Sequence, residues 1–320
     1  MNRKLAIIFV AIFISQLISI LGTQRVMASQ TIYIKADGSV YPTTAPIQQD
    51  GNIYILTADI TSDSDGIIIE RDNIRFDGVG YMLQGTGAQN YFMGINLAGR
   101  NNVTIERIGI EAFWIGINLD STSHNIICDN ELTNCSWGIN LYGFSNNNTI
   151  CDNNIAYNKY GIMLQDCYAD TISGNNITEN YWYGIASYYN CSNNIISGNI
   201  VTKHNYDGIR LLRGSNNNVV FRNILTDNNP NIRLDFSSNY NTIYGNQIRN
   251  SDCGVSLYHS SKNNSIFENE ITNNTIGISL SESSNNSIYH NNFINNSNQA
   301  YSYNSINKWD YGYPSGGNYW

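Results

Sequence analysis

The stretch NNSIFENEITNNTIGISL, residues Asn263–Leu280, sets the pattern for most of this chain. It contains three short apolar patches separated by Asn-rich segments, and it ends in Gly-Ile-x-Leu. Equivalents of this ending begin at Gly94, Gly116, Gly138, Gly161, Gly184, Gly208, Asn231 (in place of Gly), Gly254 and Gly277, which are successive steps of 22, 22, 23, 23, 24, 23, 23 and 23 residues. A fixed period of this length is the signature of a repeat architecture.

The apolar patches of one period are too short for helices. Ile266, Ile271 and the pair Ile278 and Leu280 are single apolar positions or alternate with polar residues, which is the strand period of two. The Asn, Gly and Ser residues between them favour turns. The repeat therefore predicts an all-β fold, a single-stranded right-handed parallel β-helix of roughly ten or more rungs.

Asparagine recurs at two further positions of the repeat. One column comprises Asn102, Asn125, Asn148, Asp170 (in place of Asn), Asn194, Asn218, Asn241, Asn264 and Asn286. The other comprises Asn130, Asn153, Asn175, Asn199, Asn223, Asn246, Asn269 and Asn292. Asn tolerates the backbone angles of tight bends, and identical stacked side chains can hydrogen-bond along the stack. Asn-rich disorder is the alternative, and the constant register of the apolar positions argues against it.

The chain divides into four parts. Residues 1–28 combine Arg3 and Lys4, the apolar run Leu5–Leu21 and a small-residue site at Ala28, so they are predicted to be a signal peptide or an uncleaved N-terminal anchor. Residues 29–92 depart from the period and are expected to be N-terminal capping rungs. Residues 93–300 are the regular repeats, and residues 301–320 form a Gly- and aromatic-rich tail that is expected to cover the last rung.

The charge of the chain restricts its partners. A formal net charge of −8 with 13% charged residues gives no basic stripe for a nucleic acid. No cofactor motif is recognisable, and a membrane contact is expected only through an uncleaved N-terminal segment. The expected location is extracellular or at the cell surface.

Four of the six cysteines share positions of the repeat in pairs. Cys128 and Cys151 occupy one position in successive rungs, and Cys167 and Cys191 occupy another. Stacked rungs bring Cα atoms to ~4.8 Å, within disulfide range, and export permits oxidation. Both pairs are therefore disulfide candidates, unless cysteine only fills a small apolar position. Cys135 and Cys253 share no position and are expected to be free.

Three segments outside the repeat resemble a known family, and the resemblance covers residues 30–320. TIYIKADGSVYPTTAPI at Thr31–Ile47, DGVGYMLQGTG at Asp77–Gly87 and WDYGYPSGGNYW at Trp309–Trp320 resemble the NosD-type family, in particular its archaeal surface members. The resemblance implies an exported right-handed β-helix of the pectate-lyase-like fold. The family takes its name from a copper-delivery role, but His124, His204, His259 and His290 occupy four different positions of the repeat. No metal site is therefore predicted.

By analogy with pectate-lyase-like proteins, the groove should follow the Gly-Ile-x-Leu strand and the turn before it. Aromatic side chains gather there and could hold the apolar faces of sugar rings: Trp114, Trp137, Tyr160, Trp182, Tyr183, Tyr142 and Tyr188. Trp137, Tyr160 and Tyr183 share one position, directly before the Gly, and should line up as a strip. Strand alternation leaves open that these rings point inward and only cover the core.

The same strand carries one group of charged residues, His204, Asp207, Arg210, Arg233 and Asp235. These are weak catalytic candidates for a polysaccharide lyase or epimerase, which needs a base and a group that neutralises a carboxylate. The function expected first is an exported carbohydrate-binding or envelope-scaffold protein without catalysis, acting on a polysaccharide or cell-envelope glycan. The alternatives are a lyase or epimerase acting in the groove, and a NosD-like copper accessory protein.

Overall fold

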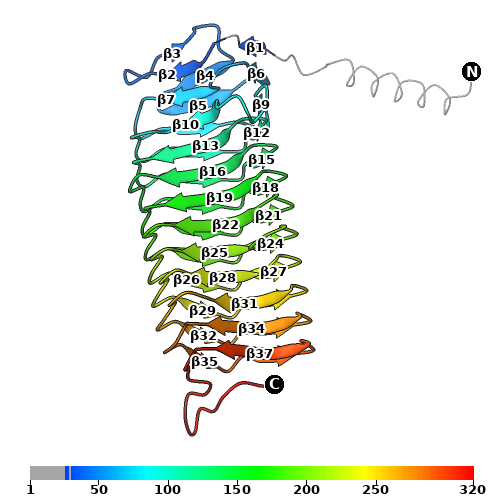
Figure 1. The fold of residues 1–320 in the computed structure, drawn as a ribbon. Coiled ribbons are helices and arrows are strands. Elements are labelled where there is room, and N and C mark those ends of the chain that lie inside the picture. The colour runs from blue at the N-terminus through cyan, green and yellow to red at the C-terminus, as the bar shows by residue number, and fades with distance from the viewer. Residues whose placement is uncertain (1–25, 29) are drawn as a thin grey trace, which may run out of the picture.

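A computed structural model describes residues 26–28 and 30–320. Within this part of the chain there is no helix, and 37 strands wind into a parallel β-helix with three sheets (Figure 1). The rungs stack along one axis from the N-terminal to the C-terminal end, as the blue-to-red order in Figure 1 shows. The predicted fold class is therefore confirmed, and the 12 or 13 strands of each sheet agree with the expected number of rungs.

Sheet A contains the second strand of each regular rung. Its order is β1 (Val26–Ala28), β6 (Ile60–Ser62), β9 (Met82–Gln84), β12 (Gly109–Glu111), β15 (Glu131–Thr133), β18 (Asn154–Ala156), β21 (Asn176–Thr178), β24 (Ile200–Thr202), β27 (Ile224–Thr226), β30 (Gln247–Arg249), β33 (Glu270–Thr272) and β36 (Asn292–Ile294).

Sheet B contains the Gly-Ile-x-Leu strands. Its order is β3 (Val40–Tyr41), β2 (Ile32–Ile34), β7 (Ile67–Ile69), β10 (Met93–Asn96), β13 (Ile115–Asp120), β16 (Trp137–Tyr142), β19 (Tyr160–Gln165), β22 (Tyr183–Tyr188), β25 (Ile209–Leu212), β28 (Ile232–Asp235), β31 (Cys253–Leu257), β34 (Ile276–Ser281) and β37 (Asn298–Tyr303).

Sheet C contains the first strand of each rung. Its order is β4 (Ile47–Asp50), β5 (Ile53–Leu56), β8 (Arg75–Asp77), β11 (Thr104–Glu106), β14 (Ile126–Cys128), β17 (Thr149–Cys151), β20 (Thr171–Ser173), β23 (Ile195–Ser197), β26 (Val219–Phe221), β29 (Thr242–Tyr244), β32 (Ser265–Phe267) and β35 (Ser287–Tyr289).

The core consists of stacked aliphatic side chains. From β8 onward, the middle residue of each three-residue strand in sheets A and C points inward, as Ile150 of β17 does, and it pairs with the same position of the next rung, here Ile172. In sheet B the inward positions are the Ile and Leu of Gly-Ile-x-Leu, such as Ile139 and Leu141 of β16. No rung can bury these side chains alone, so stacking supplies the hydrophobic stabilisation.

Buried asparagine ladders line the bends, as predicted. Asn223 shows the pattern: its Oδ1 accepts from Asn199 N at 2.9 Å, and its Nδ2 donates to Asn246 Oδ1 at 3.0 Å and to Ile196 O at 3.0 Å. Each ladder residue thus satisfies backbone groups that a bend leaves without a strand partner.

The structure corrects the ends of both predicted columns. Val103, and not Asn102, precedes Asn125 in the first ladder, because Val103 N donates to Asn125 Oδ1 at 2.8 Å while Asn102 is exposed one residue earlier. Asn291, and not Asn292, follows Asn269 in the second ladder, since Asn269 N donates to Asn291 Oδ1 at 3.1 Å. In both cases an asparagine next to the ladder position fitted the sequence pattern as well as the residue that occupies this position in the structure.

The two ends of the solenoid differ from its middle. At the N-terminal end, β2 pairs with β3 and β4 pairs with β5, both antiparallel. At the C-terminal end, Trp320 stacks on Phe293 with ring centroids 4.9 Å apart, and Asn307 and Asn318 complete two of the ladders. The predicted export segment lies outside the described residues except for β1, which pairs with β6. None of the described segments forms a helix able to cross a membrane.

One of the two candidate cysteine pairs is a disulfide. Cys128 and Cys151 are bonded between β14 and β17, with Cα atoms 4.6 Å apart. Cys167 and Cys191 are buried free thiols, which corrects the second expectation. They occupy an inward position that Ser145 and Ser215 fill in neighbouring rungs, and their Sγ atoms contact the carbonyls of Gln165 at 3.2 Å and Tyr188 at 3.3 Å.

Thiol titration should therefore distinguish the two pairs. Unfolded protein that has not been reduced is expected to show four free thiols, those of Cys135, Cys167, Cys191 and Cys253. Reduction of the bridge should lower the free energy of unfolding by about 3 kcal/mol, since it closes a loop of 23 residues. Six reactive thiols before reduction would contradict the assignment, and two would indicate a second bridge.

Candidate functional site

A continuous row of aromatic rings lies at the turn that leads into sheet B. The rings of Tyr91, Trp114, Trp137, Tyr160, Trp182 and Tyr206, here named the aromatic strip, have successive centroid distances of 4.7, 5.8, 6.3, 5.7 and 5.3 Å. These distances lie within the range of direct aromatic contact. The four central rings are half-buried, and Tyr91 and Tyr206 at the two ends are exposed.

The strip differs from the predicted one at three rings. The shared position of Trp137, Tyr160 and Tyr183 is confirmed by the strand register. Tyr183, however, is only 6% exposed, because Tyr188, Tyr206 and Arg210 pack around it. Tyr206 takes its place in the accessible row, and Tyr91 extends the row at the other end. Tyr91 was not predicted because it lies in a turn before the first regular repeat.

Tyr142 and Tyr188 lie apart from the strip. They are the last residues of β16 and β22, at the opposite end of the sheet B strands. Tyr142 is exposed, whereas Tyr188 is half-buried against Tyr183, with centroids 6.4 Å apart. Neither ring therefore continues the row formed by the strip.

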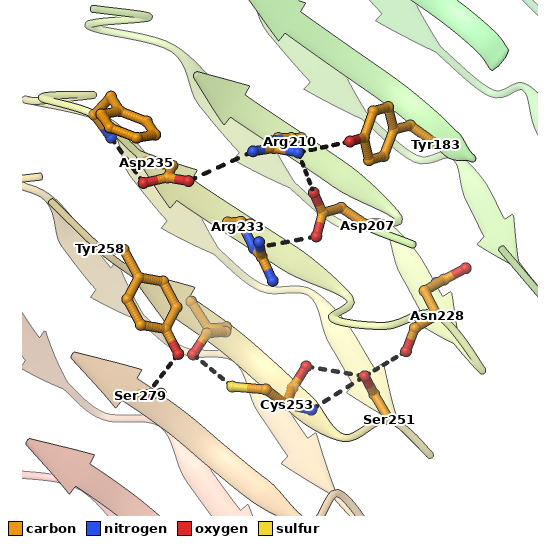
Figure 2. A network of polar contacts seen from close by, with 12 residues as sticks. Tyr183, Asp207, Arg210, Asn228, Arg233, Asp235, Ser251, Cys253, Tyr258 and Ser279 are labelled. Carbon is orange, nitrogen blue, oxygen red and sulfur yellow. Dashed lines mark hydrogen bonds and ion pairs between the residues drawn. The ribbon is translucent and has the colours of Figure 1, made fainter. Parts of the chain in front are cut away.

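Beyond the strip, sheet B carries two arginines and two aspartates, named here the Arg–Asp cluster: Asp207, Arg210, Arg233 and Asp235. Strand pairing places Arg210 next to Arg233 on the outward side of β25 and β28. Figure 2 shows Arg210 between Tyr183, Asp207 and Asp235. Arg210 donates to the Tyr183 hydroxyl at 2.7 Å and lies 3.5 Å from Asp235 Oδ2. Four of the five residues predicted as a charged group are therefore together, and His204 is not among them.

Asp207 is a buried carboxylate with imperfect partners. Its Oδ2 lies 3.4 Å from Arg210 Nη1, and its Oδ1 lies 3.2 Å from Arg233 Nε. Neither Asp207 Oδ2 nor Arg233 Nε forms a hydrogen bond, however. Burial raises the pKa of Asp207 to about 6, although both arginines act to lower it. With Asp207 only 1% exposed and Asp235 only 4% exposed, neither carboxylate is open to a substrate.

The structure corrects the placement of His204 and adds His259. His204 is a buried member of a third ladder that was not predicted, formed with Asn158, Asn180 and Asn228; its Nδ1 accepts from Asn180 N at 3.1 Å. Burial lowers its pKa to about 4, so it is neutral at neutral pH. His259 instead reaches the cluster, with Nδ1 2.7 Å from Asp235 Oδ1. The 24-residue step from Asp235 to His259 is a full rung plus one residue, which sequence reasoning did not use.

A family model described as "Periplasmic copper-binding protein (NosD)" matches residues 24–199 and 183–320. Among solved structures, the periplasmic alginate epimerase AlgG is similar, with a TM-score of 0.60 and 19% identity over 84% of this chain and 70% of that chain. DFA-IIIase from Arthrobacter chlorophenolicus A6 has a TM-score of 0.53 and 14% identity over 69% of this chain and 62% of that chain. At these identities the similarity shows the fold alone. No curated protein sequence matches the chain.

The copper in the family's description requires converging His, Cys or Met side chains. Among residues 26–28 and 30–320, no three His, Cys, Asp or Glu side chains form a group that could hold a metal ion. Cys167 and Cys191 are neighbours, but their thiols also contact carbonyl oxygens and no histidine joins them in such a group. The His and Cys side chains of the described residues therefore do not fit a copper site.

Proposed function

The chain belongs to the NosD family, and we propose that this member binds an extended polysaccharide along the outward face of sheet B without catalysing a reaction on it. The observation that carries the proposal is the aromatic strip. Six rings in contact, four of them half-buried, offer a row of apolar surface parallel to the axis of the solenoid. Sugar rings have apolar faces that such a row can hold.

The polar residues around the strip support the same proposal. Lys159 Nζ lies 5.5 Å from the Trp182 ring centroid at the rim of the strip. Asn118 and Asn140 form a side-chain ladder on β13 and β16, with Asn140 Nδ2 donating to Asn118 Oδ1 at 2.9 Å, but they are only 5% and 6% exposed and so are not counted as ligand contacts. An exposed ammonium group beside aromatic rings provides a donor of the kind that sugar hydroxyls require.

The family description and the similar epimerase are both periplasmic, which indicates an exported protein. A location at the cell surface or outside the cell is part of the proposal. It is consistent with the disulfide Cys128–Cys151, because such bonds persist in oxidising compartments.

A glycan array probed with the protein should identify bound polysaccharides, and affinities for the best of them test the strip. Trp137→Ala and Tyr160→Ala are each expected to weaken binding by about 1–2 kcal/mol, because few aromatic anchors usually dominate such interfaces. Tyr244→Ala is the matched control, since Tyr244 stacks between Phe221 and Phe267 on sheet C.

Two results would argue against the proposal. One is the absence of binding to every glycan on the array. The other is an equal loss of affinity in Tyr244→Ala and in the two strip variants. If incubation instead produces new chain ends or an epimerised polymer, the alternative of a lyase or epimerase would replace it.

A further inference from the structure

Arg210 and Arg233 are neighbours on sheet B but differ in how their guanidinium groups are used. Arg210 contacts Tyr183, Asp207 and Asp235, and its side chain is 15% exposed. Arg233 approaches one carboxylate, that of Asp207, through Nε, and its side chain is 32% exposed. Within the described residues, its two terminal amino groups have no hydrogen-bond partner. Arg233 therefore presents two free donors in the fork geometry that matches a carboxylate.

Arg233 has an aromatic ring and a buried hydroxyl beside it. Its guanidinium carbon lies 5.8 Å from the ring centroid of Tyr258, and Figure 2 shows Arg233 between Asp207 and Tyr258. Ser256 is the strand partner of Arg233 on the next rung, and its buried Oγ has no hydrogen-bond partner. Ser256 is only 1% exposed, and a buried hydroxyl without a hydrogen-bond partner is unusual. It lies beside an arginine whose terminal amino groups also have no partner in the described part of the chain.

Cationic and aromatic side chains also lie in the turns that follow these strands of sheet B. The Arg213 guanidinium carbon lies 4.9 Å from the Tyr189 ring centroid and 5.9 Å from that of Phe236, and Phe236 stacks on His259 at 4.5 Å. Together with the Arg–Asp cluster, this region carries the three arginines Arg210, Arg213 and Arg233 against the two aspartates Asp207 and Asp235. Among these five side chains the arginines outnumber the aspartates by one, on a protein whose formal net charge is −8.

Building on the proposed function, we propose that Arg233, with Ser256 and Tyr258 beside it, binds a carboxylate of the polysaccharide, so that the ligand is a uronate-containing polymer. The aromatic strip holds the sugar rings, and Tyr183 connects the two regions because its ring is 6.1 Å from Tyr206 while its hydroxyl accepts from Arg210. The positive charge of the arginines also attracts the polyanion to this face against the general charge of the protein.

The test compares polymers that differ only in their carboxylates: polygalacturonate and alginate, each beside its carboxyl-reduced form. The wild type is expected to bind an acidic polymer about tenfold more tightly than its reduced form at low salt. Added salt should reduce this ratio. Arg233→Gln should bring the ratio close to one, because it weakens binding of the acidic polymer.

Two variants control for folding and for net charge. Arg233→Lys keeps a cation beside Asp207 but cannot form a two-point contact, so it should fold and lose most of the preference. Arg222→Gln removes one charge beside Phe221, outside sheet B, and should retain the preference. A loss of preference in Arg222→Gln as large as that in Arg233→Gln would overturn the inference.

The outcomes also separate this inference from the proposed function. Two results would overturn the carboxylate site: equal binding of acidic and reduced polymers, or binding of neutral glycans only. If Trp137→Ala also weakens the binding that is observed, the proposed function stands. An absence of binding to any polymer, acidic or neutral, would reject the proposed function and this inference with it.

Discussion

Replacing Asp170 by Asn is expected to raise the free energy of unfolding at neutral pH by on the order of 3 kcal/mol. Asp170 stands in the first asparagine ladder, where its Oδ1 accepts from Asn148 N at 2.8 Å and from Asn148 Nδ2 at 3.1 Å. Its Oδ2 is buried and has no hydrogen-bond partner. Asn would place a donating amide there, as Asn218 does when its Nδ2 donates to Cys191 O at 2.9 Å.

The effect should depend on pH in a defined direction. Burial raises the pKa of Asp170 from 3.8 to about 7, although the hydrogen bonds from Asn148 act to lower it. Below pH 3.8 both the folded and the unfolded carboxyl are protonated, and the variant should differ little from the wild type. Between pH 3.8 and about 7 the unfolded state loses its proton first, so wild-type stability falls relative to the variant. Above that range the difference should be constant.

Chemical denaturation of both proteins at pH 3.5, 5.5 and 7.5 measures this difference. Asn223→Asp is the matched reverse substitution, because Asn223 makes the full set of ladder bonds. It should destabilise the protein at pH 7.5 and recover most of the loss at pH 3.5. Equal stability of Asp170→Asn and the wild type at all three values would show that the carboxyl is accommodated without cost.

The ladders show what the sequence could and could not predict. The period alone was enough for the fold class and for most members of two ladders. The ends were misplaced at Asn102 and Asn292, because neighbouring asparagines at a bend are interchangeable in a sequence pattern but not in space. The third ladder was missed because Cys135, His204 and Ser251 interrupt it, although the spacing of Asn158, Asn180 and Asn228 carried the signal.

Predictions about the site were limited by side-chain packing. Strand register correctly placed Trp137, Tyr160 and Tyr183 in one column, but burial depends on what lies beside each ring. Tyr183 is covered because an arginine and two tyrosines surround it. Likewise, His259 reaches Asp235 through the bend after β31, a path that a count of equivalent positions does not reveal.

Replacing Gly254 by Ala is expected to cost about 3 kcal/mol of stability, near the upper end for an overpacked core. A Cβ at this position would lie 2.5 Å from Gly277 O of the next rung and 2.9 Å from Ile271 Cγ2. The backbone of the next rung on one side and the core on the other leave little room to adjust, which explains why the Gly of Gly-Ile-x-Leu recurs in almost every rung.

Gly99→Ala is the control that separates a steric clash from backbone strain. The φ of Gly99 is +72°, and nothing lies within 4 Å of the added methyl, so the expected loss of stability is about 1 kcal/mol. Denaturation of both variants measures the difference, and equal losses would show that the close approach of successive rungs does not fix the glycine.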